Sequence, residues 1–170
     1  MVARTTIQEQ VVEELYAHAL ELADEARAVF DLRDAALLTE TSDRWRIAMS
    51  IEGLRTTTRV MHVLAWLLNQ RAYYAGELSK LQLLRDGALG EDRPSDPHNL
   101  ALFQSGTQAL IRASQYLHAR VRRLDDEQRR TAAHNADAVH SMHGRIAKAF
   151  GAESDNGCME QIQATERALK

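Results

Sequence analysis

The chain has 170 residues, a formal net charge of -3, 5% aromatic residues, 2 prolines and 8 glycines. This length suits one domain, or a domain with a tail, and the composition argues against a β domain. The mild negative charge excludes a bulk electrostatic attraction to nucleic acid or to an anionic membrane. The single cysteine, Cys158, excludes an internal disulfide, and no segment reaches transmembrane length, so we expect a cytoplasmic protein.

Apolar residues recur in steps of three and four, which predicts helices with one buried face each. The first helix carries Val12, Leu15, Ala19, Leu22, Ala26 and Val29. The second starts near Ser42, and its predicted buried face is formed by Ile47, Ile51, Leu54, Thr58, Met61, Ala65, Leu68, Ala72 and Ala75. It could continue to about Leu84. Residues 60–68 are apolar except for His62, so this part of the helix, with Trp66, is predicted to be buried on all sides.

Residues 86–99 hold both prolines and are predicted to form a loop. The third helix carries Phe103, Thr107, Leu110, Ser114, Leu117, Val121 and Leu124. Asp125 and Gln128 resemble a capping box that would start a fourth helix, although one continuous helix is the alternative. The fourth helix carries Ala132, Ala136, Val139, His143, Ile146 and Phe150. We therefore predict an all-α antiparallel helical bundle of three core helices plus a C-terminal fourth, in residues 1–151, with a mobile tail in 152–170.

The sequence holds no arrangement typical of catalysis, such as a Gly-rich phosphate loop, a GxSxG elbow or a CxxC pair. We therefore expect no enzyme and no cofactor. The histidines His134, His140 and His143 leave a metal-binding helical bundle as an alternative, although the Glu-x-x-His pairs of di-metal bundles are absent.

A cluster of arginines offers a second alternative, a DNA-binding transcriptional regulator. Its members are Arg120, Arg122, Arg123, Arg129 and Arg130. The acids Asp125, Asp126 and Glu127 lie between them and dilute the positive field, so a nucleic-acid partner is not expected.

The candidate protein-binding residues share one face of the second helix, about 100° around from its apolar face. They are Arg55, Arg59, His62, Trp66, Gln70 and Tyr73. Arginine and large aromatic residues are concentrated at protein interfaces. Two interpretations stay open: a surface for a partner or a second subunit, or packing against a helix of the same chain with polar ends bonded to acids such as Asp24, Glu25 or Asp31.

One block of the second helix resembles a known family. The matching residues are Glu52, Leu54, Arg55, Thr57, Thr58, Arg59, Met61, Ala65, Trp66, Leu67, Leu68, Gln70, Arg71 and Ala72. Further matches follow in order: Leu15, Tyr16, Ala19, Leu20, Leu22, Ala23, Ala26, Arg27 and Phe30, then Gly76, Glu77, Leu78 and Ser79, then Arg122, Arg123, Leu124 and Asp125. Over about residues 12–125 the chain resembles the RcdA-like family, bacterial regulators of CtrA degradation.

The resemblance implies a helical-bundle core, a homodimer and a non-enzymatic adaptor that links a regulated substrate to the ClpXP protease through other adaptors. We therefore expect a cytoplasmic adaptor or scaffold in regulated proteolysis, whose partners are protease adaptors or substrates. A homodimer is also expected because the helices carry more apolar surface than one three-helix core uses.

Overall fold

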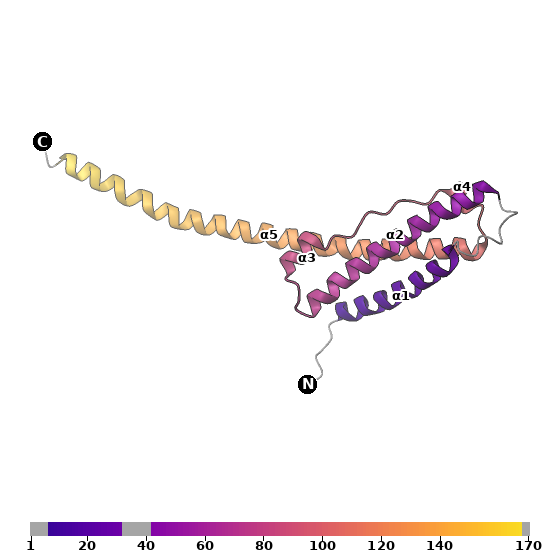
Figure 1. Ribbon diagram of the computed structural model, residues 1–170. Helices are drawn as coiled ribbons and strands as arrows, with labels where there is room; N and C mark the ends of the chain where they lie inside the picture. Colours follow the sequence, from indigo (N-terminus) through magenta and orange to yellow (C-terminus); the bar gives the residue numbers. More distant parts are fainter. Residues whose placement is uncertain (1–6, 32–41, 168–170) are drawn as a thin grey trace, which may run out of the picture. The chain divides into compact units, whose positions relative to one another are not determined.

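The computed structural model describes residues 7–31 and 42–167, with side chains left out for 136–138, 140 and 151–167. Its helices are α1 (Ile7–Phe30), α2 (Asp43–Tyr74), α3 (Lys80–Asp86), α4 (Pro97–Leu100) and α5 (Ser105–Arg167) (Figure 1). No strand occurs in these ranges, which confirms the all-α prediction. The chain divides into two compact units, Met1–Asp126 and Glu127–Lys170.

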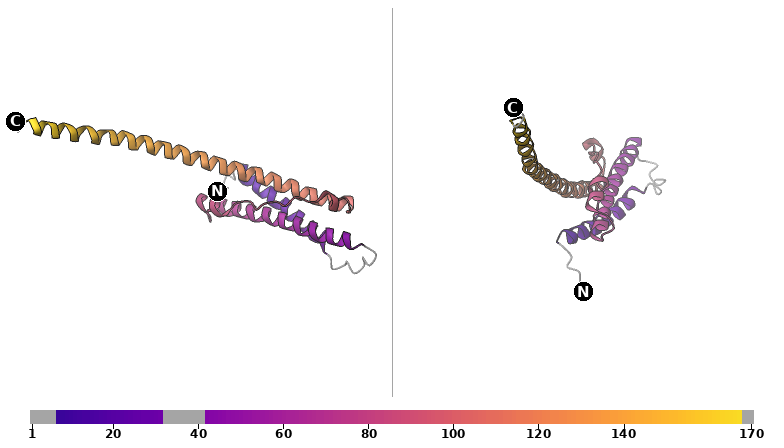
Figure 2. Two further views of the ribbon diagram at one scale, coloured as in Figure 1. Left: turned by 90° about the horizontal axis from the view of Figure 1, so that it is seen from above. Right: turned by 90° about the vertical axis from the view of Figure 1, so that its left-hand side faces the viewer.

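The first unit is a bundle of α1, α2 and the first part of α5 (Figure 2). α1 runs antiparallel to α2 and buries five of the six residues of its predicted face, Val12, Leu15, Ala19, Leu22 and Ala26, whereas Val29 is 36% exposed. These residues pack in one cluster with Val63, Trp66 and Leu67 of α2, Leu89, and Leu110, Leu117 and Val121 of α5. A second cluster, Ala48, Met49, Phe103 and Ile111, closes the end of the bundle where α2 and α5 begin.

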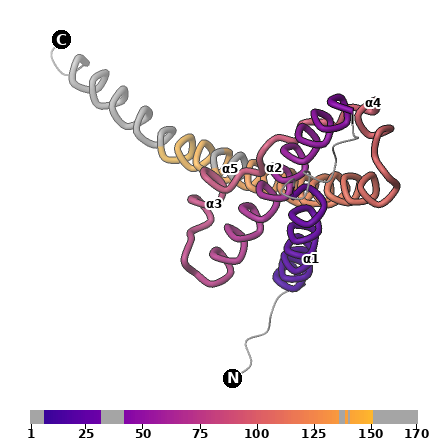
Figure 3. The backbone as a smooth tube through the Cα atoms, turned by 45° about the vertical axis from the view of Figure 1, so that its right-hand side comes forward, coloured from indigo at the N-terminus to yellow at the C-terminus, as the bar shows by residue number. Residues whose placement is uncertain are grey.

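α5 runs parallel to α2, which differs from the predicted antiparallel arrangement. Successive contacts show this direction, because Arg59 bonds to Ser114 and Trp66, further along α2, bonds to Asp125, further along α5. The chain therefore crosses back between the two helices in residues 87–96, which we call the return segment. It leads from α3 to α4 at the opposite end of the bundle (Figure 3).

α2 ends at Tyr74, so its predicted extension to Leu84 is wrong. Gly76 adopts a φ of 78°, a left-handed conformation that favours glycine, and the N–H of Glu77 bonds to the carbonyl of Ala72. A new helix then begins, because Ser79 and Gln82 form a capping box. Both signals lie in the sequence GELSKLQ.

α5 passes through Asp125 without a break, so the predicted start of a fourth helix there is wrong and the alternative of one continuous helix is confirmed. The Asp125 side chain is buried and bonds to other parts of the bundle instead of capping a helix. α5 also continues beyond residue 151, where we predicted a boundary and a linker, and the two units divide after Asp126. Helix formers such as alanine, glutamate and glutamine surround the glycines there. The side chains of the predicted tail lie outside the described residues.

Candidate protein-interaction site

The return segment is joined to both helices by side-chain hydrogen bonds, since it lacks secondary structure of its own. From α2, Arg59 Nε donates to Asp92 Oδ1 at 2.7 Å, and Glu52 Oε1 accepts from the N–H of Asp96 at 3.2 Å. From α5, Gln115 Nε2 donates to Ser95 Oγ at 3.1 Å. Backbone groups that a helix would pair internally are satisfied here by side chains.

Arg59 is the centre of this network and is only 1% exposed. Besides its ion pair with Asp92, its guanidinium donates to Ser114 Oγ at 2.9 Å and to the carbonyl of Arg93 at 3.1 Å. A buried charge needs both a counter-ion and hydrogen bonds. Arg59 has both, and it thereby joins α2, α5 and the return segment.

His118 of α5 is buried, and its Nε2 lies 2.9 Å from the carbonyl of Gly90. A carbonyl accepts only, so Nε2 carries a proton and donates it. Burial lowers the pKa of His118 below its ordinary value of 6.5, the Gly90 carbonyl and Asp92 oppose this, and the positive Arg122 and Arg59 add to it.

The six predicted site residues lie at different depths. Arg59, Trp66 and Gln70 are buried, and the expected burial of Trp66 is confirmed. Arg55, His62 and Tyr73 keep partial exposure, so of the six predicted residues these three can present a side chain to a partner. For the buried members, packing within the chain is the interpretation that the structure supports. Asp92 accepts from Arg59 and Asp125 accepts from Trp66, whereas the sequence had suggested Asp24, Glu25 or Asp31.

Sequence reasoning missed most of the residues that hold the return segment: Glu52, Asp92, Asp96, Ser114, Gln115 and His118. The available signal was that the charged residues Glu52 and Arg59 lie on the same side of a largely apolar stretch of helix. Polar residues on a buried face require partners from elsewhere in the chain.

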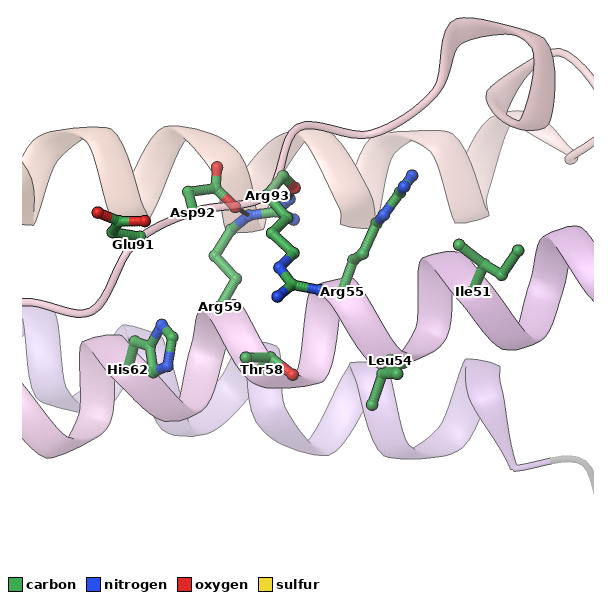
Figure 4. Close-up of a pocket in the computed structure, with 9 residues that line it drawn as sticks. All are labelled: Ile51, Leu54, Arg55, Thr58, Arg59, His62, Glu91, Asp92 and Arg93. Atoms are coloured by element: carbon green, nitrogen blue, oxygen red, sulfur yellow. Dashed lines mark hydrogen bonds and ion pairs between the residues drawn. The ribbon is translucent and has the colours of Figure 1, made fainter.

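A pocket of about 610 Å³ opens between α2 and the return segment (Figure 4). It is lined by Ile51, Leu54, Arg55, Thr58, Arg59 and His62 of α2 and by Glu91, Asp92 and Arg93 of the return segment. Arg55 Nη1 donates to Oε1 of the fully buried Glu52 at 2.6 Å, which satisfies one cation of the lining. The guanidinium of Arg93 lies over α2 and points towards Thr58.

The predicted buried face of α2 is in fact its exposed face, and the prediction that residues 60–68 are buried on all sides is therefore wrong. Leu54 is 71% exposed, Met61 60% and Leu68 48%, and Ile47, Ile51, Thr58 and Ala65 are exposed as well. We call these seven residues the exposed seam. The helix is apolar on two opposite sides, and the side with the polar residues is buried because the return segment supplies their partners.

The second unit also carries exposed apolar side chains, namely Val139, Met142, Ile146 and Phe150. Among the arginines of the suggested DNA-binding cluster, Arg130 pairs with Glu127 at 3.0 Å, and Arg122 donates to the Gly90 carbonyl at 3.2 Å. His134 and His143 are exposed, and His140 lies outside the described side chains. Where side chains are described, no three His, Cys, Asp or Glu residues are grouped to hold a metal ion.

In the described part of the chain, no helix combines the length and apolar character that crossing a membrane requires. No curated protein and no solved structure significantly matches the chain. A family model described as "Protein of unknown function (DUF1465)" matches residues 3–150. This match includes the whole bundle, the return segment and the exposed seam, and the chain therefore belongs to the DUF1465 family.

Proposed function

We propose that the chain is a non-enzymatic adaptor or scaffold in regulated proteolysis, and that it works as a homodimer through protein–protein contacts. The exposed seam of α2 carries this proposal. A monomeric soluble protein rarely leaves a long contiguous apolar face uncovered, and such faces mark protein interaction sites. The resemblance of residues 12–125 to the RcdA-like family supports the choice of regulated proteolysis.

A second copy of the chain is the occupant that fits the seam. Its residues alternate in steps of four and three, the spacing of a coiled-coil seam, so the large residues Ile47, Leu54, Met61 and Leu68 are seven apart. Small residues, Thr58 and Ala65, stand between them in the second half. A two-fold axis can therefore place large side chains of one copy over small ones of the other, over about 30 Å of helix.

Light scattering tests the dimer at micromolar concentration, where a mass near twice the 19.1 kDa of one chain is expected. Leu54→Asp with Met61→Asp should give a folded monomer, because both side chains are exposed within one chain. Leu81→Asp is the matched control, since Leu81 is 77% exposed on α3, away from the seam. A parent chain near 19 kDa, or a double variant that stays dimeric, would refute this arrangement.

The adaptor role is tested by reconstituted degradation with ClpXP, its other adaptors and CtrA as substrate. The chain should raise the degradation rate at a concentration where its dimer is formed, and the double aspartate variant should raise it less. A rate unchanged by the wild-type chain across a range of concentrations would exclude an adaptor function in this system.

A further inference from the structure

We propose that the pocket between α2 and the return segment binds a short segment of a partner protein in which an aspartate or glutamate stands next to an aliphatic residue. The carboxylate pairs with Arg93, and the aliphatic side chain packs on Ile51 and Leu54. This inference rests on the proposed adaptor function, because it names the kind of partner that the adaptor holds.

Arg93 is the cation that the pocket offers. Its main-chain carbonyl is held by Arg59 Nη2 at 3.1 Å, and the preceding residue, Asp92, is held by Arg59 Nε at 2.7 Å. The base of the side chain is thus fixed on the rigid bundle. No described residue gives the Arg93 guanidinium a hydrogen bond or an ion pair, although it lies over α2 within the pocket (Figure 4). A planar guanidinium matches a carboxylate with two parallel hydrogen bonds.

His62 supplies a second group with an unfilled bonding capacity. Its Nδ1 is buried and has no partner among the described residues. Gly90 lies against the ring so closely that an added Cβ would stand 2.4 Å from Nδ1. A proton on Nδ1 would have no acceptor, so the tautomer with its proton on Nε2 is favoured, and that N–H can be donated to a ligand.

The charges around the pocket favour a carboxylate over a phosphate. Arg59 is paired with Asp92 and Arg55 with Glu52, so among the arginines of the lining Arg93 is the one to which no described residue gives an ion pair. Glu91 stands at one end of the lining with its own negative charge. That charge repels any anion, and it repels a dianion about twice as strongly as a carboxylate, whereas one guanidinium pairs with one carboxylate through two hydrogen bonds.

The other end of the pocket is apolar. Ile51 and Leu54 are 39% and 71% exposed, so they can cover an aliphatic side chain beside the carboxylate. Arg55 and His62 lie about 90° and about 70° around α2 from the middle of the exposed seam. Ile51 and Leu54 also belong to the exposed seam, so a peptide in the pocket and a dimer formed through the seam compete for these two side chains.

The probe is a six-residue peptide, blocked at both ends, in which leucine is followed by aspartate among glycines and serines. Its twin carries asparagine instead. Two-dimensional NMR of the full-length ¹⁵N-labelled chain follows the Nε–Hε signals of arginine. The aspartate peptide should shift the Arg93 signal in a saturable manner, and the twin should bind at least about tenfold more weakly, because a hydrogen bond to a charged group is lost.

Arg93→Gln should weaken binding of the aspartate peptide by a similar factor, and Arg93→Lys should fall between, since it keeps the charge without the planar fork. Arg44→Gln, an exposed arginine of α2 outside the pocket, is the control and should bind like the parent chain. Equal binding of the two peptides, full binding by Arg93→Gln, or inorganic phosphate that displaces the peptide at a lower concentration would each overturn the proposal.

The degradation assay separates this inference from the proposed function. A chain that speeds degradation but does not bind the aspartate peptide would remain an adaptor and would overturn the pocket. A chain that binds the peptide through Arg93 and leaves degradation unchanged would support the pocket and overturn the adaptor role.

Discussion

The indole Nε1 of Trp66 donates to Oδ1 of Asp125 over 3.0 Å, and both side chains are buried. The other carboxylate oxygen of Asp125 accepts from the N–H of Leu89 at 3.3 Å. One acid on α5 therefore connects α2 with the return segment. Asp125 thus bonds to Trp66, which is 59 positions away in the sequence, and to Leu89, which is 36 positions away.

Trp66→Phe should destabilise the bundle by about 1 to 3 kcal/mol, because it removes a donor from a buried carboxylate while keeping an aromatic ring. Trp66→Ala should cost about 3 to 5 kcal/mol, since a large buried side chain is lost. Urea unfolding measures both. Trp45→Phe is the control, because Trp45 is half-buried and makes an edge contact with Phe103 at 6.4 Å. Equal losses for the two phenylalanine variants would contradict the role of the indole N–H.

Asp92→Asn should lower the free energy of unfolding by about 2 to 3 kcal/mol, because it leaves the buried Arg59 without its counter-ion. Hydrogen exchange should also accelerate at the amides of Leu89 and Asp96, which the return segment presents to its partners. Asp86→Asn removes an exposed carboxylate, 2.8 Å from Arg85, and should change neither measurement.

The stability of the bundle should fall as the pH drops below 6.5, through His118. The unfolded chain takes up a proton at the ordinary pKa of 6.5, whereas burial holds the pKa of folded His118 lower. The unfolded state thus binds more protons in this window, and stability rises with pH by up to about 1.4 kcal/mol per pH unit. The contribution is complete above pH 6.5 and is lost progressively as the pH falls.

Urea unfolding between pH 7.5 and pH 5.5 checks this, with His118→Gln as the variant. The free energy of unfolding of this variant should depend less on pH than that of the parent chain. His98→Gln, at an exposed position in α4, should keep the parent dependence. A parent chain that becomes more stable as the pH falls through 6.5 would show that the sign is wrong.

Gly76→Ala should cost about 1 to 2 kcal/mol, because the residue has a φ of 78° and alanine is strained there. No atom lies within 4 Å of the added Cβ, so the cost comes from the backbone alone. Gly106→Ala meets no atom either, but it lies in the first turn of α5 and should be neutral or stabilise by up to about 1 kcal/mol. Because neither added Cβ is crowded, a difference in melting temperature between the two variants reports the backbone conformation alone. Equal effects would contradict this account.

The sequence was sufficient to locate the helices whose periodicity is simple. Most of the buried face of α1 and the start of α2 at Ser42 follow from local patterns, and the structure confirms them. The loop predicted in 86–99 is confirmed for 87–96, whereas Asp86 belongs to α3 and residues 97–99 to α4. The end of α2 also has local sequence signals, namely Gly76 and the Ser79 capping box. The apolar spacing of Leu78 and Leu81 nevertheless favoured a longer helix, and the prediction followed that spacing.

The buried face of α2 could not be predicted in the same way, because it depends on contacts distant in sequence. Ile51 and Leu54 look like core residues, and Glu52 and Arg59 look like surface residues. The return segment reverses both assignments by bringing Asp92 and the N–H of Asp96 to the polar side. Polar side chains can be buried here because distant residues provide hydrogen-bond partners, and the periodicity of apolar residues along one helix carries no information about those partners. The pocket is formed by the same return segment, so it could not be predicted from the sequence either.

The parallel course of α2 and α5 sets an order of events during synthesis on the ribosome. α1 and α2 are neighbours in the chain and can pair as soon as both have emerged, whereas Arg59 must wait for Ser114 and Trp66 for Asp125. Contacts over such separations form slowly because a long loop must be closed first. Until then the open side of the nascent hairpin displays Glu52, Arg59 and Gln70, which water solvates well. Until α5 arrives, the unfinished core thus presents these polar groups beside the apolar side chains of Val63, Trp66 and Leu67, which later pack against α5.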